Sequence, residues 1–207
     1  MDKAFFTPYP GQYPSRAATI HFSGSAVKSS LPWTTVEQTL PSISKFAAIV
    51  FYSSNVDRCT QDLVDQGEGK PPRYVYNTTM NLGAPYNEAA GLRGLVPLHA
   101  PLQQQLPVFD GVLDLVRCGH AVNQWIPVTA MEFLFYDLDR VLRGGGYLWL
   151  DRFFCKGIDL DKVYAPLIGK LGYKKVKWAV ANKTDSSGVK NGEVYLTALL
   201  QKPVSSK

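Results

Sequence analysis

The sequence predicts an α/β domain in which a mainly parallel sheet lies between layers of helices. Short apolar segments alternate with amphipathic ones from residue 46 onward, the pattern of strands joined by crossover helices. The last two expected strands have no helix between them, so they form a hairpin and one of them runs antiparallel. A length of 207 residues with 45% hydrophobic composition suits one domain with a sizeable core.

The first third of the chain has weak structural signals. Residues 1–45 are rich in Pro, Ser and Thr with no sustained period, so we expect an irregular, partly disordered arm. Residues 46–52 form an apolar run typical of a buried strand, and a short helix is expected from 53 to about 65. A Gly- and Pro-rich loop or linker over 66–72 completes an atypical strand-helix segment.

Residues 73–203 carry the sharper pattern and form the main predicted domain. The spacing predicts helices over 88–93, from about 127 to 143, and over 161–171. A polar turn is expected over 182–191. Strands are expected at 74–80, 95–99, 112–118, 147–153, 173–180 and 193–201.

The helix that begins near Pro127 has the clearest signal in the chain. Proline suits the first turn because its missing N–H would have no helical partner there. The run Gly144-Gly145-Gly146 is interpreted as the C-cap that ends this helix. Its apolar residues recur at helical spacing: Val128, Met131, Leu134, Phe135, Leu138, Val141 and Leu142.

The net charge of +5 is unevenly distributed. Residues 1–150 hold 11 Lys/Arg against 12 Asp/Glu, whereas residues 151–207 hold 11 against 5. A basic last quarter is compatible with phosphate binding, but no aromatic-and-basic pattern of a nucleic-acid-binding module accompanies it. Lysines on a solvated surface are the simpler interpretation.

The reactive residues exclude several classes of site. Cys59, Cys118 and Cys155 are widely spaced, which argues against a disulfide scaffold or a cysteine zinc site, and the three scattered histidines predict no metal site. No apolar run reaches the roughly 20 residues of a membrane span, and no secretory signal is visible. We therefore expect a soluble chain, cytoplasmic by default.

Two stretches resemble a known family. Residues 109–116 carry an Asp-Leu-Val strand, and residues 137–148 carry a helix end of the form Arg-Val-Leu-Arg-Gly-Gly followed by a strand. They look like the fourth and fifth strands of class I S-adenosylmethionine-dependent methyltransferases. Residues 81–88 and 125–203 resemble plant members of this superfamily. The resemblance implies a Rossmann-like three-layer sandwich with a terminal hairpin, S-adenosylmethionine as cofactor, and an endomembrane location for many relatives.

The chain departs from this family at the cofactor loop. Such enzymes hold the methionine part of the cofactor on a glycine-rich turn after the first strand. No G-x-G-x-x-G is present, and residues 53–57 (Ser-Ser-Asn-Val-Asp) follow the expected first strand. Two functions therefore stay open: a methyltransferase for a small-molecule or glycan acceptor, and a degenerate, non-catalytic interaction or regulatory protein.

The resemblance also suggests cofactor contacts. Asn81 stands near the end of the second strand, where the family has a carboxylate for the ribose hydroxyls, although Asn81 also suits a plain turn. Pro101, Leu102 and Gln104 follow the third strand, beside which adenine would lie, although apolar residues there equally suit a surface loop that packs on the core. Cys118 ends the fourth strand and is the remaining cofactor-side residue.

Methyl transfer needs alignment and often a base that removes a proton from the acceptor. His120 follows the fourth strand directly and is the candidate base, with a backbone-bonded loop histidine as the alternative. Asn123 and Trp125 are the candidate acceptor-pocket residues. Asp110 and Asp114 are interpreted as structural.

Overall fold

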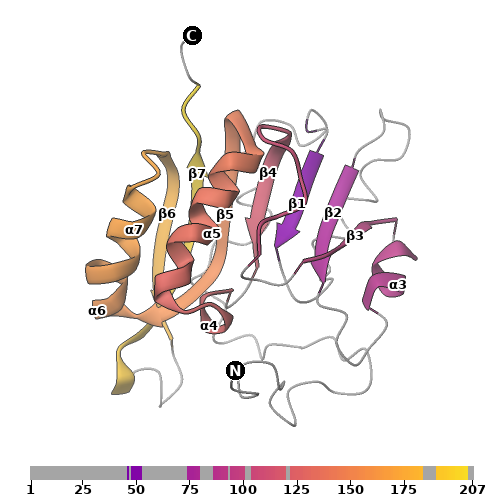
Figure 1. Ribbon diagram of the computed structural model, residues 1–207. Coiled ribbons are helices and arrows are strands. Elements are labelled where there is room, and N and C mark those ends of the chain that lie inside the picture. Colours follow the sequence, from indigo (N-terminus) through magenta and orange to yellow (C-terminus); the bar gives the residue numbers. More distant parts are fainter. Residues whose placement is uncertain are drawn as a thin grey trace.

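The computed structural model describes residues 46, 48–52, 74–79, 86–92, 94–100, 104–119, 122–183 and 190–204. Their strands form a seven-stranded sheet in the order β3-β2-β1-β4-β5-β7-β6 (Figure 1). The strands are β1 (Ala48–Tyr52), β2 (Tyr74–Thr79), β3 (Val96–His99), β4 (Leu113–Cys118), β5 (Leu142–Lys156), β6 (Lys174–Asn182) and β7 (Glu193–Gln201). The helices are α3 (Tyr86–Gly91), α4 (Val122–Trp125), α5 (Val128–Val141), α6 (Gly157–Asp159), η3 (Leu160–Tyr164) and α7 (Ala165–Gly169).

The predicted mainly parallel sheet with a terminal hairpin is confirmed. Strand β1 pairs in parallel with β2 and β4, and the parallel pairing continues to β3 on one side and β5 on the other. Strand β7 runs antiparallel to both of its neighbours, β5 and β6. The strand at 48–52 therefore lies inside the same sheet as the later strands, between β2 and β4. The expected arm at 1–45 and the expected helix at 53–65 fall outside the described residues.

Helix α5 crosses one face of the sheet beside the segment α6–η3–α7 (Figure 1). Five residues of the predicted apolar stripe are buried beneath it: Met131, Leu134, Phe135, Leu138 and Val141. They pack on Val116, Leu148 and Leu150 of the sheet in one continuous core. Val128 is the exception at 46% exposed, because the first residue of the helix extends past the core.

The predicted helix cap at Gly144–Gly146 is wrong. Helix α5 ends at Val141, Leu142 is already extended, and β5 contains all three glycines. A Cβ on Gly146 would lie 2.9 Å from the Arg143 carbonyl oxygen and 3.2 Å from those of Leu113 and Asp114. Glycine is therefore required there by the close approach of β4 to β5, where their register shifts.

The predicted helix at 161–171 begins earlier and ends earlier than expected. The helical segment starts at Gly157 and passes through a π-helical turn, where the Ala165 N–H donates to the Leu160 carbonyl. Pro166, in the first turn of α7, has no N–H to continue a regular ladder. Gly172 then takes a positive φ of 65° and turns the chain into β6.

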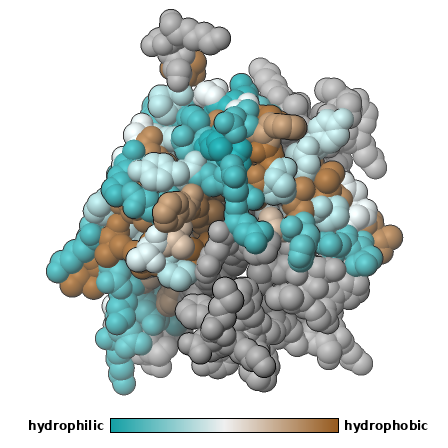
Figure 2. All heavy atoms as spheres, in the orientation of Figure 1, coloured by the Kyte–Doolittle hydropathy of each residue, from teal (hydrophilic) through white to brown (hydrophobic). Residues whose placement is uncertain are grey.

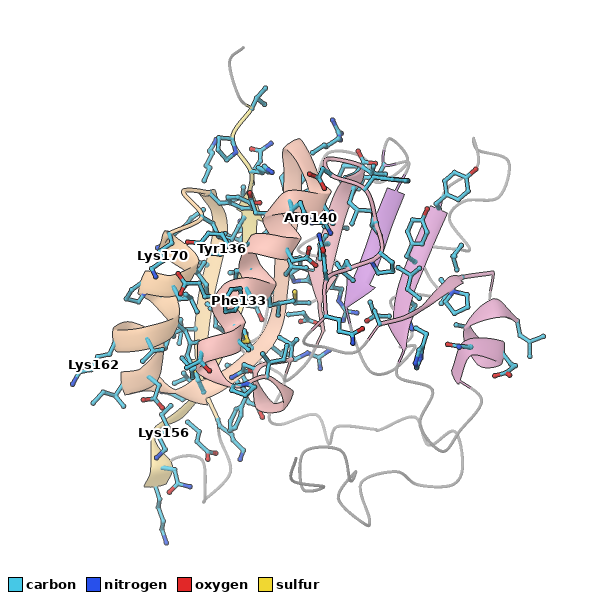
Figure 3. The ribbon with its side chains drawn as sticks, in the orientation of Figure 1. Phe133, Tyr136, Arg140, Lys156, Lys162 and Lys170 are labelled. Carbon is cyan, nitrogen blue, oxygen red and sulfur yellow. The ribbon has the colours of Figure 1, made fainter. Side chains whose placement is uncertain are left out.

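The outer surfaces of α5 and α7 are joined by polar contacts (Figure 3). Lys170 Nζ lies 2.6 Å from Glu132 Oε1, to which the Tyr136 hydroxyl also donates at 3.4 Å. Phe133 lies beside them and is 76% exposed. Figure 2 shows hydrophobic and hydrophilic side chains interspersed over this face. This surface therefore carries isolated apolar residues between charged ones.

Candidate functional site

The strand order creates a topological switch point between β1 and β4. The chain passes from β1 to β2 on one side, whereas β4 lies against β1 on the other. Tyr52 at the end of β1 is in register with Cys118 at the end of β4, and Cys118 is in register with Leu150 of β5. In open α/β sheets, ligands bind outside the carboxyl ends of the strands at such a point. We call this region the carboxyl edge of β1, β4 and β5.

Cys118 ends β4 at this edge, and its thiol is neutral and buried in the core. Its side chain is 1% exposed, and burial raises the pKa of the thiol from 9.0 to about 12. A thiol is a poor nucleophile because the thiolate is the reactive form. Cys118 can therefore line a ligand site without attacking a bound electrophile.

Helix α4 follows β4 and is tied to β5 by Asn123. The Asn123 side-chain amide donates a hydrogen bond to the Phe154 carbonyl. Phe154 belongs to the part of β5 that extends past Leu150, the last residue in register with β4. The other half of the amide, Oδ1, is buried and has no hydrogen-bond partner in the part of the chain that the structure describes. A buried acceptor without a donor costs about 1–3 kcal/mol, so it is a polar group still to be satisfied.

A buried ion pair lies on the sheet face opposite α5. Arg117 Nη2 is 2.5 Å from Asp151 Oδ2, and the two side chains are 1% and 4% exposed. The Arg117 guanidinium also lies 4.7 Å from the centre of the Trp149 ring. Arg117 and Trp149 are in register on neighbouring strands, so the three side chains form one cluster between the end of β4 and the middle of β5.

Strand β5 is irregular directly after this pair. Its register with β7 shifts between Leu150 and Phe153. Arg152 lies within the shift at φ 51°, and among the described residues it is the one non-glycine with positive φ. Its backbone N–H lies 3.4 Å from the Thr197 hydroxyl of β7. β-Bulges next to functional sites commonly redirect a side chain.

Comparisons with solved structures decide the fold. A methyltransferase of Methanosarcina mazei matches with a TM-score of 0.62 at 14% identity, over 85% of this chain and 100% of that one. The 1,6-didemethyltoxoflavin N1-methyltransferase of Burkholderia thailandensis, solved with S-adenosylhomocysteine, matches with a TM-score of 0.54 at 15% identity, over 76% and 71%. This is the S-adenosylmethionine-dependent methyltransferase fold.

The sequence comparison agrees with this methyltransferase fold. A probable methyltransferase of Arabidopsis thaliana is 77% identical over 131 residues, which cover 63% of this chain. Those residues are 34% of the relative, so the chain spans about a third of its length. No protein-family model matches the chain. The predicted resemblance to plant members of the methyltransferase superfamily is confirmed.

Some of the predicted site residues lie in the described part of the structure and others do not. Cys118 and Asn123 lie at the carboxyl edge, and Trp125 ends helix α4 beside them. Gln104 is exposed, in the segment between β3 and β4. The remaining predicted residues, Asn81, Pro101, Leu102 and His120, fall outside the described residues, as do residues 53–73 after β1.

The two aspartates interpreted as structural form ion pairs at the opposite edge of the sheet. Asp114 pairs with Arg143, and Asp110 pairs with Arg140 at 2.6 Å. Within the described ranges no group of His, Cys, Asp and Glu has the geometry to hold a metal ion. No described helix has the length and apolar character needed to cross a bilayer.

The sequence interpretation missed the cluster of Arg117, Asp151 and Arg152. Each of these charged residues stands in a strand whose other residues are largely apolar, at 113–118 and 147–155. A charged side chain in a strand that is buried on both faces needs a partner of opposite charge. This pattern is the sequence signal that could have identified the three residues. Their pairing across 34 positions follows only from the register of β4 and β5.

Proposed function

We propose that the chain forms the core of an S-adenosylmethionine-dependent methyltransferase that acts on a small-molecule acceptor. The observation that carries the proposal is the sheet order β3-β2-β1-β4-β5-β7-β6 with an antiparallel β7, together with 77% identity to a probable methyltransferase. The acceptor class is supported by structural neighbours solved with small acceptors. One is the 1,6-didemethyltoxoflavin N1-methyltransferase described above. Another is a geranyl diphosphate C-methyltransferase of Streptomyces coelicolor, which matches this chain with a TM-score of 0.53 at 10% identity.

The residues at the carboxyl edge fit such a cofactor in two respects. Cys118 stays protonated, which suits a neighbour of an activated methyl group because a thiolate there would itself be methylated. Asn77 Oδ1, two residues before the end of β2, is a buried acceptor with no hydrogen-bond partner among the described residues. An adenosyl ligand is rich in N–H and O–H donors that suit such acceptors.

In this proposal Asn81 binds the ribose hydroxyls, while Pro101, Leu102 and Gln104 contact the adenine and Cys118 lines the cofactor site. The bound cofactor supplies a methyl group activated on a sulfonium. His120, directly after β4, removes the proton from the acceptor, and Asn123 and Trp125 hold the acceptor in line for the displacement. Helix α4 is suited to this role because Asn123 attaches it to β5.

A non-catalytic methyltransferase-like protein is the second candidate. It is favoured by the sequence after β1, where Ser53, Ser54, Asn55, Val56 and Asp57 occupy the positions of the usual glycine-rich turn. Without glycine, backbone and cofactor approach less closely. Such a protein would keep the fold and act through binding a partner.

Calorimetric titration with S-adenosylmethionine and S-adenosylhomocysteine separates the two candidates. The methyltransferase proposal expects saturable binding of both ligands to the folded chain. An absence of heat at millimolar ligand, for a sample that unfolds cooperatively, would overturn it in favour of the non-catalytic candidate. His120→Ala is expected to retain cofactor binding and to lose turnover, and unchanged turnover would dismiss His120 as the base.

A further inference from the structure

Arg152 has a backbone conformation that its side chain does not favour. A φ of 51° is costly for an L-residue with a long side chain, and such conformations cluster at functional sites. The bulge between Leu150 and Phe153 holds it there. Either glycine or asparagine would occupy this position with less strain. The presence of arginine therefore points to a use for its side chain.

Among the described residues, the Arg152 side chain has one long ion-pair contact. Its partner is Asp151, whose Oδ2 is already bound by Arg117 at 2.5 Å. Arg152 Nε lies 3.5 Å from the other oxygen, Oδ1, and within the described part of the chain the Arg152 side chain makes no hydrogen bond. The Arg152 guanidinium therefore keeps a donor-rich surface open to solvent, since 29% of its side chain is exposed.

The position of Arg152 places its guanidinium at the candidate site. Strand β4 ends at Cys118, opposite Leu150, so Arg152 lies two residues past the end of β4. It is therefore at the carboxyl edge of the sheet, where ligands of this fold class bind. A guanidinium presents a planar fork of donors that matches a carboxylate or phosphate.

We propose that Arg152 binds an anionic group, a carboxylate or a phosphate, of the methyl acceptor. Arg117 and Asp151 are positioning residues: their ion pair fixes the Asp151 carboxylate, beside which the Arg152 guanidinium lies. This inference rests on the proposed methyltransferase function and narrows its acceptor to an anionic small molecule.

The test uses the full chain loaded with S-adenosylhomocysteine and three fluorinated probes observed by ¹⁹F NMR. The probes are 4-fluorobenzoate, 4-fluorophenyl phosphate and 4-fluorobenzyl alcohol, which share a ring and differ in their polar group. At least one anionic probe is expected to bind the wild type about tenfold more tightly than the alcohol, and the preferred anion identifies carboxylate or phosphate. Equal binding of the alcohol would overturn the inference without any variant.

Three variants test whether the anionic probe binds at Arg152. Arg152→Gln is expected to lose the preference for the anion, and Arg152→Lys to keep part of it because the charge remains without the fork. Arg143→Gln is the matched control, since the Arg143 side chain is half exposed and pairs with Asp114 at the opposite edge. An equal loss in Arg143→Gln would attribute the effect to overall charge and overturn the inference.

Titration with S-adenosylhomocysteine separates this inference from the function on which it rests. Its affinity is expected to be unchanged in Arg152→Gln, and a loss would assign Arg152 to the cofactor instead of the acceptor. Tight S-adenosylhomocysteine binding without any anion preference overturns the inference alone. An absence of S-adenosylhomocysteine binding to the wild type overturns both.

Discussion

The Arg117 guanidinium and the Asp151 carboxylate form an ion pair in which both side chains are almost completely buried, 2.5 Å apart between the end of β4 and the middle of β5. Taking two charges out of water is costly, and their close pairing offsets part of that cost. The pair couples the two strands that meet at the carboxyl edge, so it links the stability of the sheet to the geometry of the candidate site.

Removal of one partner of this pair is expected to be strongly destabilising. Asp151→Asn or Arg117→Ala should lower the free energy of unfolding by about 3–5 kcal/mol, because an uncompensated charge or a cavity is left in the core. Urea denaturation followed by circular dichroism measures this loss. Replacing both residues, with Arg117→Met and Asp151→Leu, should cost less than either single change. A larger loss in the double variant would contradict this account.

Arg140 is expected to hold the segment before β4 in place. Its guanidinium donates to the carbonyls of Leu106 and Val108 and binds Asp137 and Asp110 (Figure 3). Arg140→Ala should destabilise the fold by about 2–3 kcal/mol, since each bond contributes about 0.5–1.5 kcal/mol.

The matched control for Arg140 is Asp110→Ala. The Asp110 side chain is 78% exposed, so its loss should cost less than about 1 kcal/mol. Chemical denaturation of both variants gives the comparison. Equal losses would show that Arg140 acts through the surface ion pair and not through the two carbonyls.

Gly146→Ala is expected to destabilise the protein through steric overlap. The new Cβ would meet the Arg143 carbonyl oxygen at 2.9 Å, and the resulting shift of β4 against β5 should cost about 1–3 kcal/mol. Gly169→Ala in α7 is the control, because nothing lies within 4 Å of its added Cβ. Its stability should stay unchanged or rise by up to about 1 kcal/mol. Thermal unfolding distinguishes the two, and a tolerated Gly146→Ala would refute the close-approach argument.

The stability of the fold is expected to decrease at alkaline pH through Cys118. Its thiol keeps its proton in the folded chain up to a pKa of about 12, whereas the unfolded chain releases that proton near 9.0. The folded state therefore binds more protons between these values, and the free energy of unfolding falls by about 1.4 kcal/mol per pH unit. Below pH 9 the contribution is fully present.

Denaturation at pH 8, 9 and 10 measures this loss, with Cys118→Ala as the comparison. The variant lacks the titrating thiol, so its stability should decline less steeply above pH 9 than that of the wild type. Cys155, whose pKa burial raises to about 11, contributes a smaller change in the same direction in both proteins. Identical pH slopes for the two proteins would count against a protonated, buried Cys118.

Local patterns in the sequence predicted most of the described strands and the longest helix. The apolar stripe of α5 matches the buried residues because a helix repeats every 3.6 residues whatever it packs against. The strands at 74–79, 113–118 and 193–201 were predicted to within a residue or so for the same local reason, and the terminal hairpin followed from the missing crossover helix. Cys118 was predicted at the edge because it ends a strand, and Asn123 because it follows the same strand within a few residues.

The remaining features depend on contacts between distant segments. The use of Gly144–Gly146 inside β5 depends on how closely β4 approaches, and the pairing of Arg117 with Asp151 depends on the register of their strands. The functional roles of all the predicted site residues stay predictions: Asn81, Pro101, Leu102, Gln104, Cys118, His120, Asn123 and Trp125.

The sequence by itself therefore determined the order of strands and helices and the methyltransferase fold, because hydrophobic periodicity and family motifs are local properties. Only the tertiary structure decided which charges are buried together and where β5 bulges. These depend on register, and a shift of one residue would move every side chain of a strand to the other face. In this protein that register brings Arg117, Asp151 and Arg152 together at the edge where the fold binds its ligands.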